Sequence, residues 1–191
     1  MSIRPYPVAL ENENSANANV ADMYKSWTLN EIRADLDKKR TPLVSVFMNL
    51  THEFNKASGI RASNAYLGDH VYLVGRRKYN RKGTVGTHQY EHVSSADTLS
   101  EVVELLHEKG YTVFAVDNID SYNPKNIWDV DLPEKSAFVY GEEMRGLQPE
   151  EIELCDDMIF CQMYGSVRSL NVAQCSAVVM NEYSKQNRHL R

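Results

Sequence analysis

The feature that most constrains the fold is a regular alternation of short apolar segments with amphipathic ones, from Leu43 to Lys185. Segments such as Leu43–Leu50 and Tyr111–Val116 are rich in β-branched and aromatic residues, as buried strands are. The apolar residues of Leu99–Leu106 recur at helical spacing instead. This rhythm predicts an α/β fold with a mainly parallel sheet covered by helices on both faces.

The expected elements follow from apolar spacing and from glycine and proline positions. Strands are predicted at 43–50, 71–74, 111–116, 137–140 and 158–161, and helices at 56–67, from Ser95 or Asp97 to Gly110, near 149–153 and at about 170–185. Residues 83–93 and 117–134 are predicted to be irregular. In such a fold the ligand lies at the carboxyl ends of the strands, so the loops after the strands are the candidates for a site.

The first 42 residues differ from the rest. They are polar and Asn-rich to Asn19, and their later apolar residues recur at spacings of three to five, as in an amphipathic helix or a broken pair of helices. Those residues are Val20, Met23, Tyr24, Trp27, Ile32 and Leu36. We expect a short N-terminal helical appendage at 1–42 and one main domain at 43–191.

Composition narrows the class of protein. The 191 residues contain no apolar run long enough to span a bilayer, and the N-terminus lacks the apolar core of a secretory signal. Three cysteines without a C-x-x-C pair fit reduced thiols packed in a cytoplasmic fold better than disulfides or a zinc ribbon. The net charge of −5 excludes indiscriminate binding of polyanions, so contact with nucleic acid must be local.

One segment offers such a local contact. Residues 76–82 carry five positive charges, on Arg76, Arg77, Lys78, Arg81 and Lys82. Tyr79 lies among them and offers a ring on which a base can stack. The segment predicts contact with RNA phosphates, and a solvated surface loop explains it equally well.

Polar residues gather in three of the loops that follow strands. They are Asn55 and Arg61 after the first strand, Gly141, Glu143 and Gly146 after the fourth, and Ser169 and Asn171 after the fifth. Each has an ordinary interpretation too, because glycines form turns, Ser and Asn cap helices, and arginines cover surfaces. Spacing alone does not decide between the two interpretations.

Taken together, these residues form three motifs. The motifs are Asn55-x(5)-Arg61, Gly141-x-Glu143-x-x-Gly146-Leu147 and Met163-x-Gly165-x-x-x-Ser169-Leu170-Asn171-Val172. In this order they resemble the signature motifs of the SpoU-type branch of the SPOUT methyltransferases, which methylate RNA ribose 2′-hydroxyls with S-adenosylmethionine. The resemblance implies a homodimer and a C-terminal trefoil knot, an exception to the rule against threaded chains.

The resemblance also implies roles for single residues. The cofactor's adenine would be held by main chain around Asn118, Gly141, Cys161, Met163 and Leu170. Arg61 would face the transferred methyl group, as a base or as a clamp on the phosphate beside the target ribose. The polar site positions would be Asn55, Glu143, Ser169 and Asn171. For the dimer interface, we expect an apolar stripe on the last helix, formed by Val178, Val179, Met180 and Tyr183.

The sequence departs from the family pattern where Gln162 replaces a proline and Ala57 a glycine, which predicts a looser cofactor loop. An alternative function is therefore a catalytically silent, methyltransferase-like RNA-binding protein. The resemblance implies transfer or ribosomal RNA as the substrate, and no motif in the N-terminal appendage chooses between them.

His88-Gln-Tyr-Glu91-His92 matches the H-x-x-E-H zinc-protease pattern, but Gly86 before it and Ser94 after it leave no room for the long helix which that site needs. We expect no metal.

Overall fold

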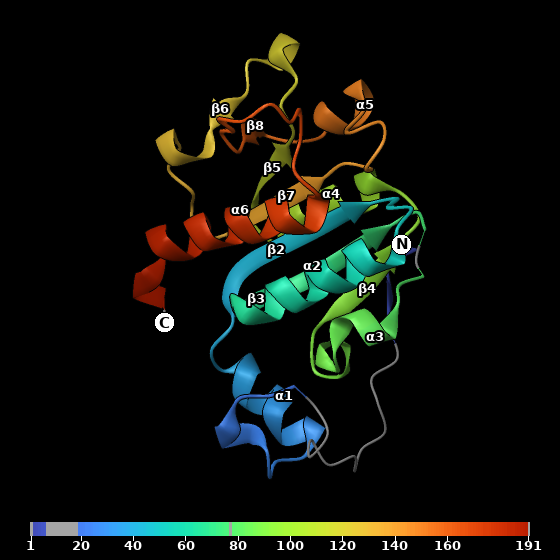
Figure 1. The fold of residues 1–191 in the computed structure, drawn as a ribbon, viewed down its shortest axis with the longest axis vertical. Coiled ribbons are helices and arrows are strands. Elements are labelled where there is room, and N and C mark those ends of the chain that lie inside the picture. Colours follow the sequence, from blue (N-terminus) through green and yellow to red (C-terminus); the bar gives the residue numbers. More distant parts are fainter. Residues whose placement is uncertain (1, 7–18, 77, 191) are drawn as a thin grey trace.

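An eight-stranded sheet forms the centre of the computed structural model, which describes residues 2–6, 19–76 and 78–190 (Figure 1). The strand order is β1-β4-β3-β2-β7-β5-β8-β6, and every pair is parallel except β1 with β4. The strands are β1 (Arg4–Pro5), β2 (Thr41–Met48), β3 (Gly68–Val74), β4 (Val93–Ala96), β5 (Thr112–Val116), β6 (Lys125–Asn126), β7 (Ser136–Tyr140) and β8 (Asp157–Phe160). The predicted parallel α/β sheet is confirmed.

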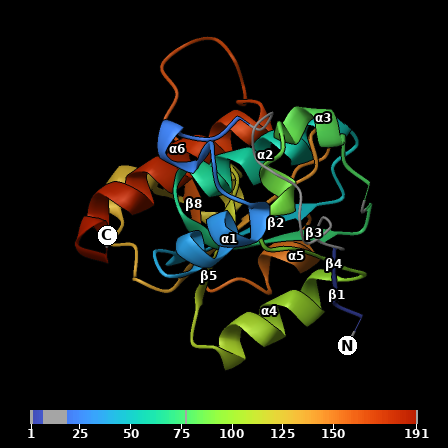
Figure 2. The ribbon, with the colours of Figure 1, turned by 90° about the horizontal axis from the view of Figure 1, so that it is seen from below.

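The helices cover both faces of this sheet. They are α1 (Leu29–Asp37), α2 (Glu53–Ala65), α3 (Arg81–Thr84), α4 (Leu99–Glu108), α5 (Pro149–Ile152) and α6 (Val172–Gln186), with 3-10 turns at Asp22–Tyr24, Thr87–Gln89, Asp120–Tyr122, Ile127–Asp129 and Arg188–Leu190. Figure 2 shows α2 and α6 on one side of the sheet and α4 on the other. Each side has its own apolar core. Within the described residues, no helix has the length and apolar character needed to cross a bilayer.

Strand β4 was not predicted: it begins at Val93, the last residue of the segment predicted to be irregular, and runs through the region where a helix cap was expected. Its residues Val93-Ser-Ser-Ala are buried, but only the first is a typical strand residue. The hydroxyl of Ser94 pairs with the His70 ring at 2.9 Å, and that of Ser95 donates to the Arg4 carbonyl at 3.5 Å. Small buried hydroxyls with such partners leave no apolar pattern in the sequence. The helix that follows is capped by Thr98, rather than by Ser95 or Asp97.

The apolar stripe predicted on the last helix for a dimer interface is not on the surface of α6. Val179, Met180 and Tyr183 are fully buried in the core of the same chain, and the Tyr183 ring packs edge-on against Phe138. Only Val178 is exposed. These side chains face inward because α6 lies directly on the sheet, so they are not available to a second copy.

The N-terminal region contains the broken pair of helical segments, the turn Asp22–Tyr24 and α1. A capping box between Thr28 and Glu31 begins α1, and an apolar cluster joins the helix to Tyr90 of the main sheet region. Met23 is exposed, contrary to the predicted apolar face. The region is not purely helical, since β1 adds a strand to the sheet beside β4.

Candidate active site

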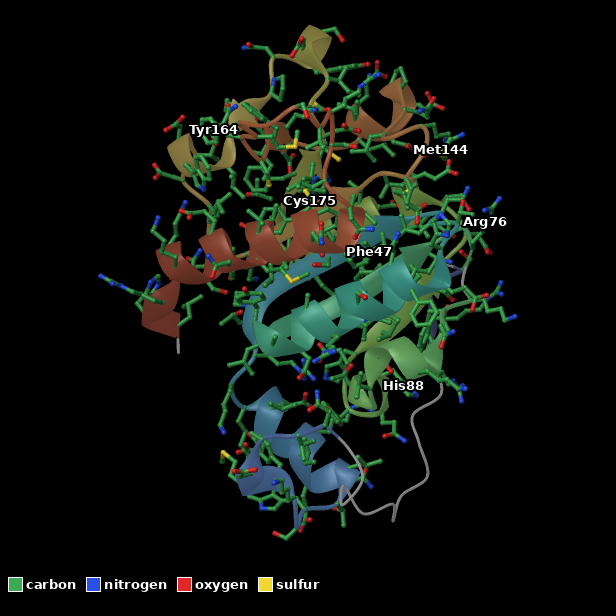
Figure 3. All side chains as sticks on the ribbon, in the orientation of Figure 1. Phe47, Arg76, His88, Met144, Tyr164 and Cys175 are labelled. Atoms are coloured by element: carbon green, nitrogen blue, oxygen red, sulfur yellow. The ribbon has the colours of Figure 1, made fainter. Side chains whose placement is uncertain are left out.

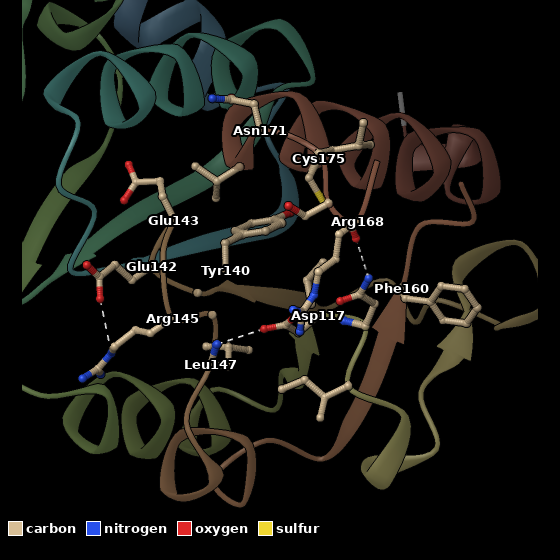
Figure 4. A pocket seen from close by; sticks show the side chains of 18 of the residues that line it. Asp117, Tyr140, Glu142, Glu143, Arg145, Leu147, Phe160, Arg168, Asn171 and Cys175 are labelled. Carbon is tan, nitrogen blue, oxygen red and sulfur yellow. Dashed lines mark hydrogen bonds and ion pairs between the residues drawn. The ribbon is translucent and has the colours of Figure 1, made fainter. Parts of the chain in front are cut away.

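A cavity of about 900 Å³ lies at the carboxyl ends of β5, β7 and β8 (Figure 4). The last residues of these strands, Val116, Tyr140 and Phe160, line it together with the loops that follow. Residues at the starts of α2 and α6 complete the wall. This is the edge at which open α/β sheets bind ligands, and the volume suits a nucleoside-sized molecule.

Glu143 connects the loop after β7 to the start of α2. Its carboxylate accepts hydrogen bonds from the amides of Thr51 at 2.9 Å and His52 at 3.2 Å, and from Asn55 Nδ2 at 3.0 Å. Burial acts to raise the pKa of the Glu143 carboxyl, but these hydrogen bonds outweigh it and hold the pKa below its ordinary value. The carboxylate thus fixes the two residues that precede α2 and the side chain of Asn55 in its first turn, and the helix begins at Glu53, before the predicted Lys56.

Asn171 extends this connection to α6. Its Oδ1 caps the helix by accepting from the amides of Ala173 at 3.0 Å and Gln174 at 3.4 Å. Its Nδ2 donates to Asn55 Oδ1 at 3.0 Å. Glu143, Asn55 and Asn171 thus form one hydrogen-bonded chain that holds two helix N-termini beside the cavity.

The loop after β7 turns back tightly on itself. A Cβ on Gly141 would lie 2.5 Å from the Gly146 carbonyl carbon, so only glycine permits this close approach. Gly146 has a φ of +66°, and Asp117 accepts from the Leu147 amide at 2.9 Å. The turn places polar main-chain groups along the cavity wall.

The loop between β8 and α6 lies over the other side of the cavity. Asn118 Nδ2 donates to the Arg168 carbonyl at 2.9 Å and ties this loop to the end of β5. Tyr164 and Val167 are exposed on the loop, as is Met144 on the loop opposite (Figure 3). Apolar side chains are therefore exposed on both loops that border the cavity.

The structure places around one cavity nine of the ten residues to which the family resemblance assigns a polar or cofactor-binding role. The residues that line the cavity are Asn55, Asn118, Gly141, Glu143, Cys161, Met163, Ser169, Leu170 and Asn171. The lining also includes residues that the sequence analysis did not single out, among them Asp117, Tyr140 and Cys175. Tyr140 and Cys175 belong to apolar patterns typical of core, and no local signal marks them as cavity residues.

Arg61 is the exception. It is exposed on α2 and does not belong to the cavity lining, so it does not face the cavity of its own chain. Six helical residues rotate a side chain by about 600°, which leaves Arg61 about 120° away from Asn55 around the helix and about 9 Å further along it. The expected position beside a bound cofactor is therefore not found within one chain.

The basic segment lies beside the start of α2. Arg76, Lys78, Arg81 and Lys82 are exposed, whereas Arg77 lies outside the described residues. The buried Lys56 donates to the carbonyls of Arg76 at 2.7 Å and Lys78 at 2.9 Å. One buried lysine thereby holds the main chain while the basic side chains stay in solvent.

The H-x-x-E-H residues occupy a short 3-10 turn and the loop after it. Glu91 is fully buried and accepts from the Arg40 guanidinium at 2.8 Å. Across the ranges that the structure describes, no three His, Cys, Asp or Glu residues are placed to hold a metal ion.

Comparison with known sequences shows where the chain belongs. Residues 42–181 match the model of the SpoU rRNA Methylase family. The chain is 28% identical over 162 residues to the tRNA (guanosine(18)-2′-O)-methyltransferase of Aquifex aeolicus (strain VF5), covering 83% of this chain and 76% of that protein. It is 25% identical over 155 residues to the enzyme of the same name from Escherichia coli (strain K12), covering 79% and 67%.

Solved structures show the same fold. The A. aeolicus TrmH/SpoU tRNA modifying enzyme superposes with a TM-score of 0.75 at 24% identity, covering 84% of this chain and 83% of that one. The SpoU methyltransferase AviRb from Streptomyces viridochromogenes, in complex with AdoMet, gives 0.70 at 20% identity over 81% and 64%. At these identities the likeness establishes the fold alone.

Proposed function

The chain belongs to the SpoU rRNA methylase family, and we infer that it is an RNA ribose 2′-O-methyltransferase that uses S-adenosylmethionine. The observation that carries this inference is that residues from all three motifs meet at one cavity edge, where Asn55 is hydrogen-bonded to both Glu143 and Asn171. The two relatives described above, which are named for 2′-O-methylation of tRNA, support it.

The residues around the cavity fit the cofactor. The volume suits a nucleoside with an amino-acid arm, and the buried Tyr140 hydroxyl lacks a hydrogen-bond partner among the described residues. S-adenosylmethionine supplies a methyl group on a positively charged sulfur. We propose that main chain near Asn118, Gly141 and Cys161, with Met163 and Leu170, holds it.

The polar chain of Glu143, Asn55 and Asn171 acts by positioning in this proposal. Every acceptor and donor named above is occupied by a neighbour, so these side chains hold two helices in place rather than remove a proton. Ser169, exposed at the cavity, is proposed to orient the ribose. Correct placement of the hydroxyl against the methyl group is itself a large part of such catalysis.

Arg61 requires a second subunit in this scheme. We propose a homodimer in which Arg61 of one copy reaches the cavity of its partner, because it is exposed and lies outside its own cavity. The exposed Phe54, Met144, Tyr164 and Val167 support such an interface. There Arg61 clamps a phosphate, since a guanidinium keeps its proton and offers a planar pair of donors. Light scattering tests this proposal, because a homodimer has twice the single-chain mass of 21.8 kDa.

Three further proposals concern the whole chain. The strand order β7-β5-β8 and the contact of Asn118 with Arg168 support a trefoil knot between β5 and α6. Residues 1–42 are proposed as an appendage to a catalytic domain at 43–191. A cytoplasmic location suits a protein that modifies transfer or ribosomal RNA.

Two assays test the function. Titration calorimetry with S-adenosylmethionine is expected to show binding, and transfer of tritiated methyl to total tRNA or to rRNA is expected to show turnover. Binding of RNA with neither cofactor binding nor transfer would instead establish the silent RNA-binding alternative. Mass analysis of nucleosides from cells with and without the protein identifies the RNA.

A further inference from the structure

Two cysteines meet at the wall of the cavity. Cys161 follows β8 directly, and Cys175 lies in the first turn of α6, where its amide donates to the Asn171 carbonyl at 2.8 Å. Their sulfur atoms are 3.8 Å apart, and both residues line the cavity. Cys175 is labelled in Figure 4 beside the ring of Tyr140.

The pair is close enough to react without rearrangement of the fold. A disulfide has a sulfur–sulfur distance of about 2.05 Å, so the sulfurs at 3.8 Å need to approach by about 1.8 Å. Rotation of two cysteine side chains covers such a distance. Both side chains border the cavity, so a small oxidant that enters it reaches them.

The two thiols are not equivalent. The hydrogen bond from Cys175 lowers the pKa of the Cys161 thiol against the effect of burial. The same hydrogen bond, together with burial, raises the pKa of Cys175. The thiolate is the nucleophile, so Cys161 reacts first and Cys175 keeps the proton that a second step needs.

Tyr140 supplies a second observation. Its side chain is fully buried, its hydroxyl has no hydrogen-bond partner among the described residues, and it points toward Cys175 (Figure 4). A hydroxyl in that position can donate to a negatively charged sulfur or to a departing hydroxide. The thiol pair thus has a proton donor beside it.

We propose that Cys161 and Cys175 are a peroxide-sensitive dithiol that closes to a disulfide and lowers the affinity for S-adenosylmethionine. The Cys161 thiolate attacks a peroxide oxygen, the O–O bond breaks, and a sulfenic acid and hydroxide form. Cys175 then attacks the sulfenic sulfur, the disulfide forms, and water leaves with the thiol proton. A dithiol reductant reverses the change.

The effect on the cofactor rests on the proposed function of the cavity. Disulfide formation moves two sulfurs of the cavity wall and joins the end of β8 to the first turn of α6, across the loop that carries Met163 and Leu170. Cys155 is the matched control, because it packs in the core on the opposite side of the sheet. Its thiol donates to the Glu151 carbonyl at 3.5 Å, and burial raises its pKa to about 12.

The chemical step is tested without the cofactor. The full chain is treated with hydrogen peroxide, and its free thiols are counted and mapped by mass spectrometry. Wild type is expected to fall from three thiols to one, with a peptide pair linking Cys161 to Cys175. Cys155→Ser is expected to form the same link, and Cys175→Ser none. An unlinked wild type, or a link through Cys155, would overturn the proposal.

The functional step is tested by calorimetry on reduced, oxidised and re-reduced protein. Oxidation is expected to weaken binding of S-adenosylmethionine about tenfold or more in wild type and Cys155→Ser, with recovery on reduction, a change of about 1.4 kcal/mol. Equal loss in Cys175→Ser, or a linked protein with unchanged affinity, overturns the switch. If reduced protein does not bind S-adenosylmethionine, the proposed function and the proposed effect of oxidation on affinity both fail. The thiol mapping still decides whether the disulfide forms, because that test uses no cofactor.

Discussion

Helix α2 has a carboxylate near each end, and the two are in opposite electrostatic situations. At the first turn, Glu143 accepts from two amides of the helix start and from Asn55. Near the last turns, Glu91 accepts from Asn64 at 3.0 Å, Ser63 at 3.4 Å and the Arg40 guanidinium at 2.8 Å. Both carboxylates therefore have three donors, and one donor to Glu91 carries a full positive charge.

Their pKa values nevertheless shift in opposite directions. Burial raises the pKa of Glu91 to about 7, although Arg40 and the two other donors act to lower it. The pKa of Glu143 falls below its ordinary value, because its burial is partial and its donors prevail. A helix N-terminus also favours an anion and a C-terminus disfavours one. The comparison shows that burial and position on the helix, more than the number of donors, decide how easily a carboxylate ionises.

The largest expected effect comes from removing Arg40, the charged partner of the buried Glu91. Arg40 contacts Asp37, Glu91 and the carbonyls of Gly68 and Tyr90. Arg40→Ala leaves the buried Glu91 carboxylate without its charged partner and is expected to lower the free energy of unfolding by about 3–5 kcal/mol in urea denaturation. Arg145→Ala is the control, since Arg145 also pairs with two carboxylates but is exposed, and a loss below about 1 kcal/mol is expected. Equal losses would contradict the comparison.

Glu91 and Glu143 are expected to change the stability in opposite directions as pH rises. Folded Glu91 keeps its proton to about pH 7, whereas the unfolded residue releases it near pH 4.5, so its contribution falls as pH rises between these values. Between these pH values the free energy of unfolding of wild type is expected to fall by up to about 3 kcal/mol relative to that of Glu91→Gln.

Glu143 gives the opposite sign. Its stabilising contribution is present above pH 4.5 and is lost as pH falls through its lowered pKa, and Glu143→Gln removes that acid loss. Denaturation curves from pH 3 to 8 check both variants. Parallel pH profiles for wild type and Glu91→Gln would show that Glu91 does not titrate in the window.

Arg61 lies between the two ends and contacts neither carboxylate. Arg61→Ala is expected to leave cofactor affinity within a few fold and to lower methyl transfer by roughly 10² or more, the scale for losing a charge-stabilising group. Arg61→Lys is expected to recover little, because an ammonium lacks the planar two-point grip of a guanidinium. Calorimetry measures the cofactor affinity, and the transfer assay measures the rate of methyl transfer. Wild-type transfer by Arg61→Ala would show that the residue has no part in the reaction.

The smallest expected effect concerns the basic segment, residues 76–82, beside the N-terminus of α2. Arg76→Ala with Lys78→Ala is expected to flatten the dependence of log RNA affinity on log salt by roughly 0.7 for each lost contact with a single-strand phosphate. Lys109→Ala is the control, because this exposed lysine ends α4 and precedes β5, at the edge of the sheet opposite the cavity. An unchanged slope in the double variant would identify the segment as a solvated loop.

The amino-acid sequence by itself determined the parallel α/β architecture, most helices and strands to within a few residues, and several of the polar residues at the cavity. These properties are local, because apolar periodicity and the spacing of a motif are complete within one segment. The loops after β7 and β8 were identifiable as site loops because parallel strands end at one edge.

Only the tertiary structure decided what depends on partners far along the chain. Glu143 accepts from the His52 amide, just before α2, from 91 residues away, and Asn171 reaches Asn55 across 116 residues. The burial of Val179 and Tyr183, the outward direction of Arg61 and the approach of Cys161 to Cys175 arise in the same way. An apolar or polar residue looks the same in the sequence whichever surface it meets, so its neighbour is known only when the chain has folded.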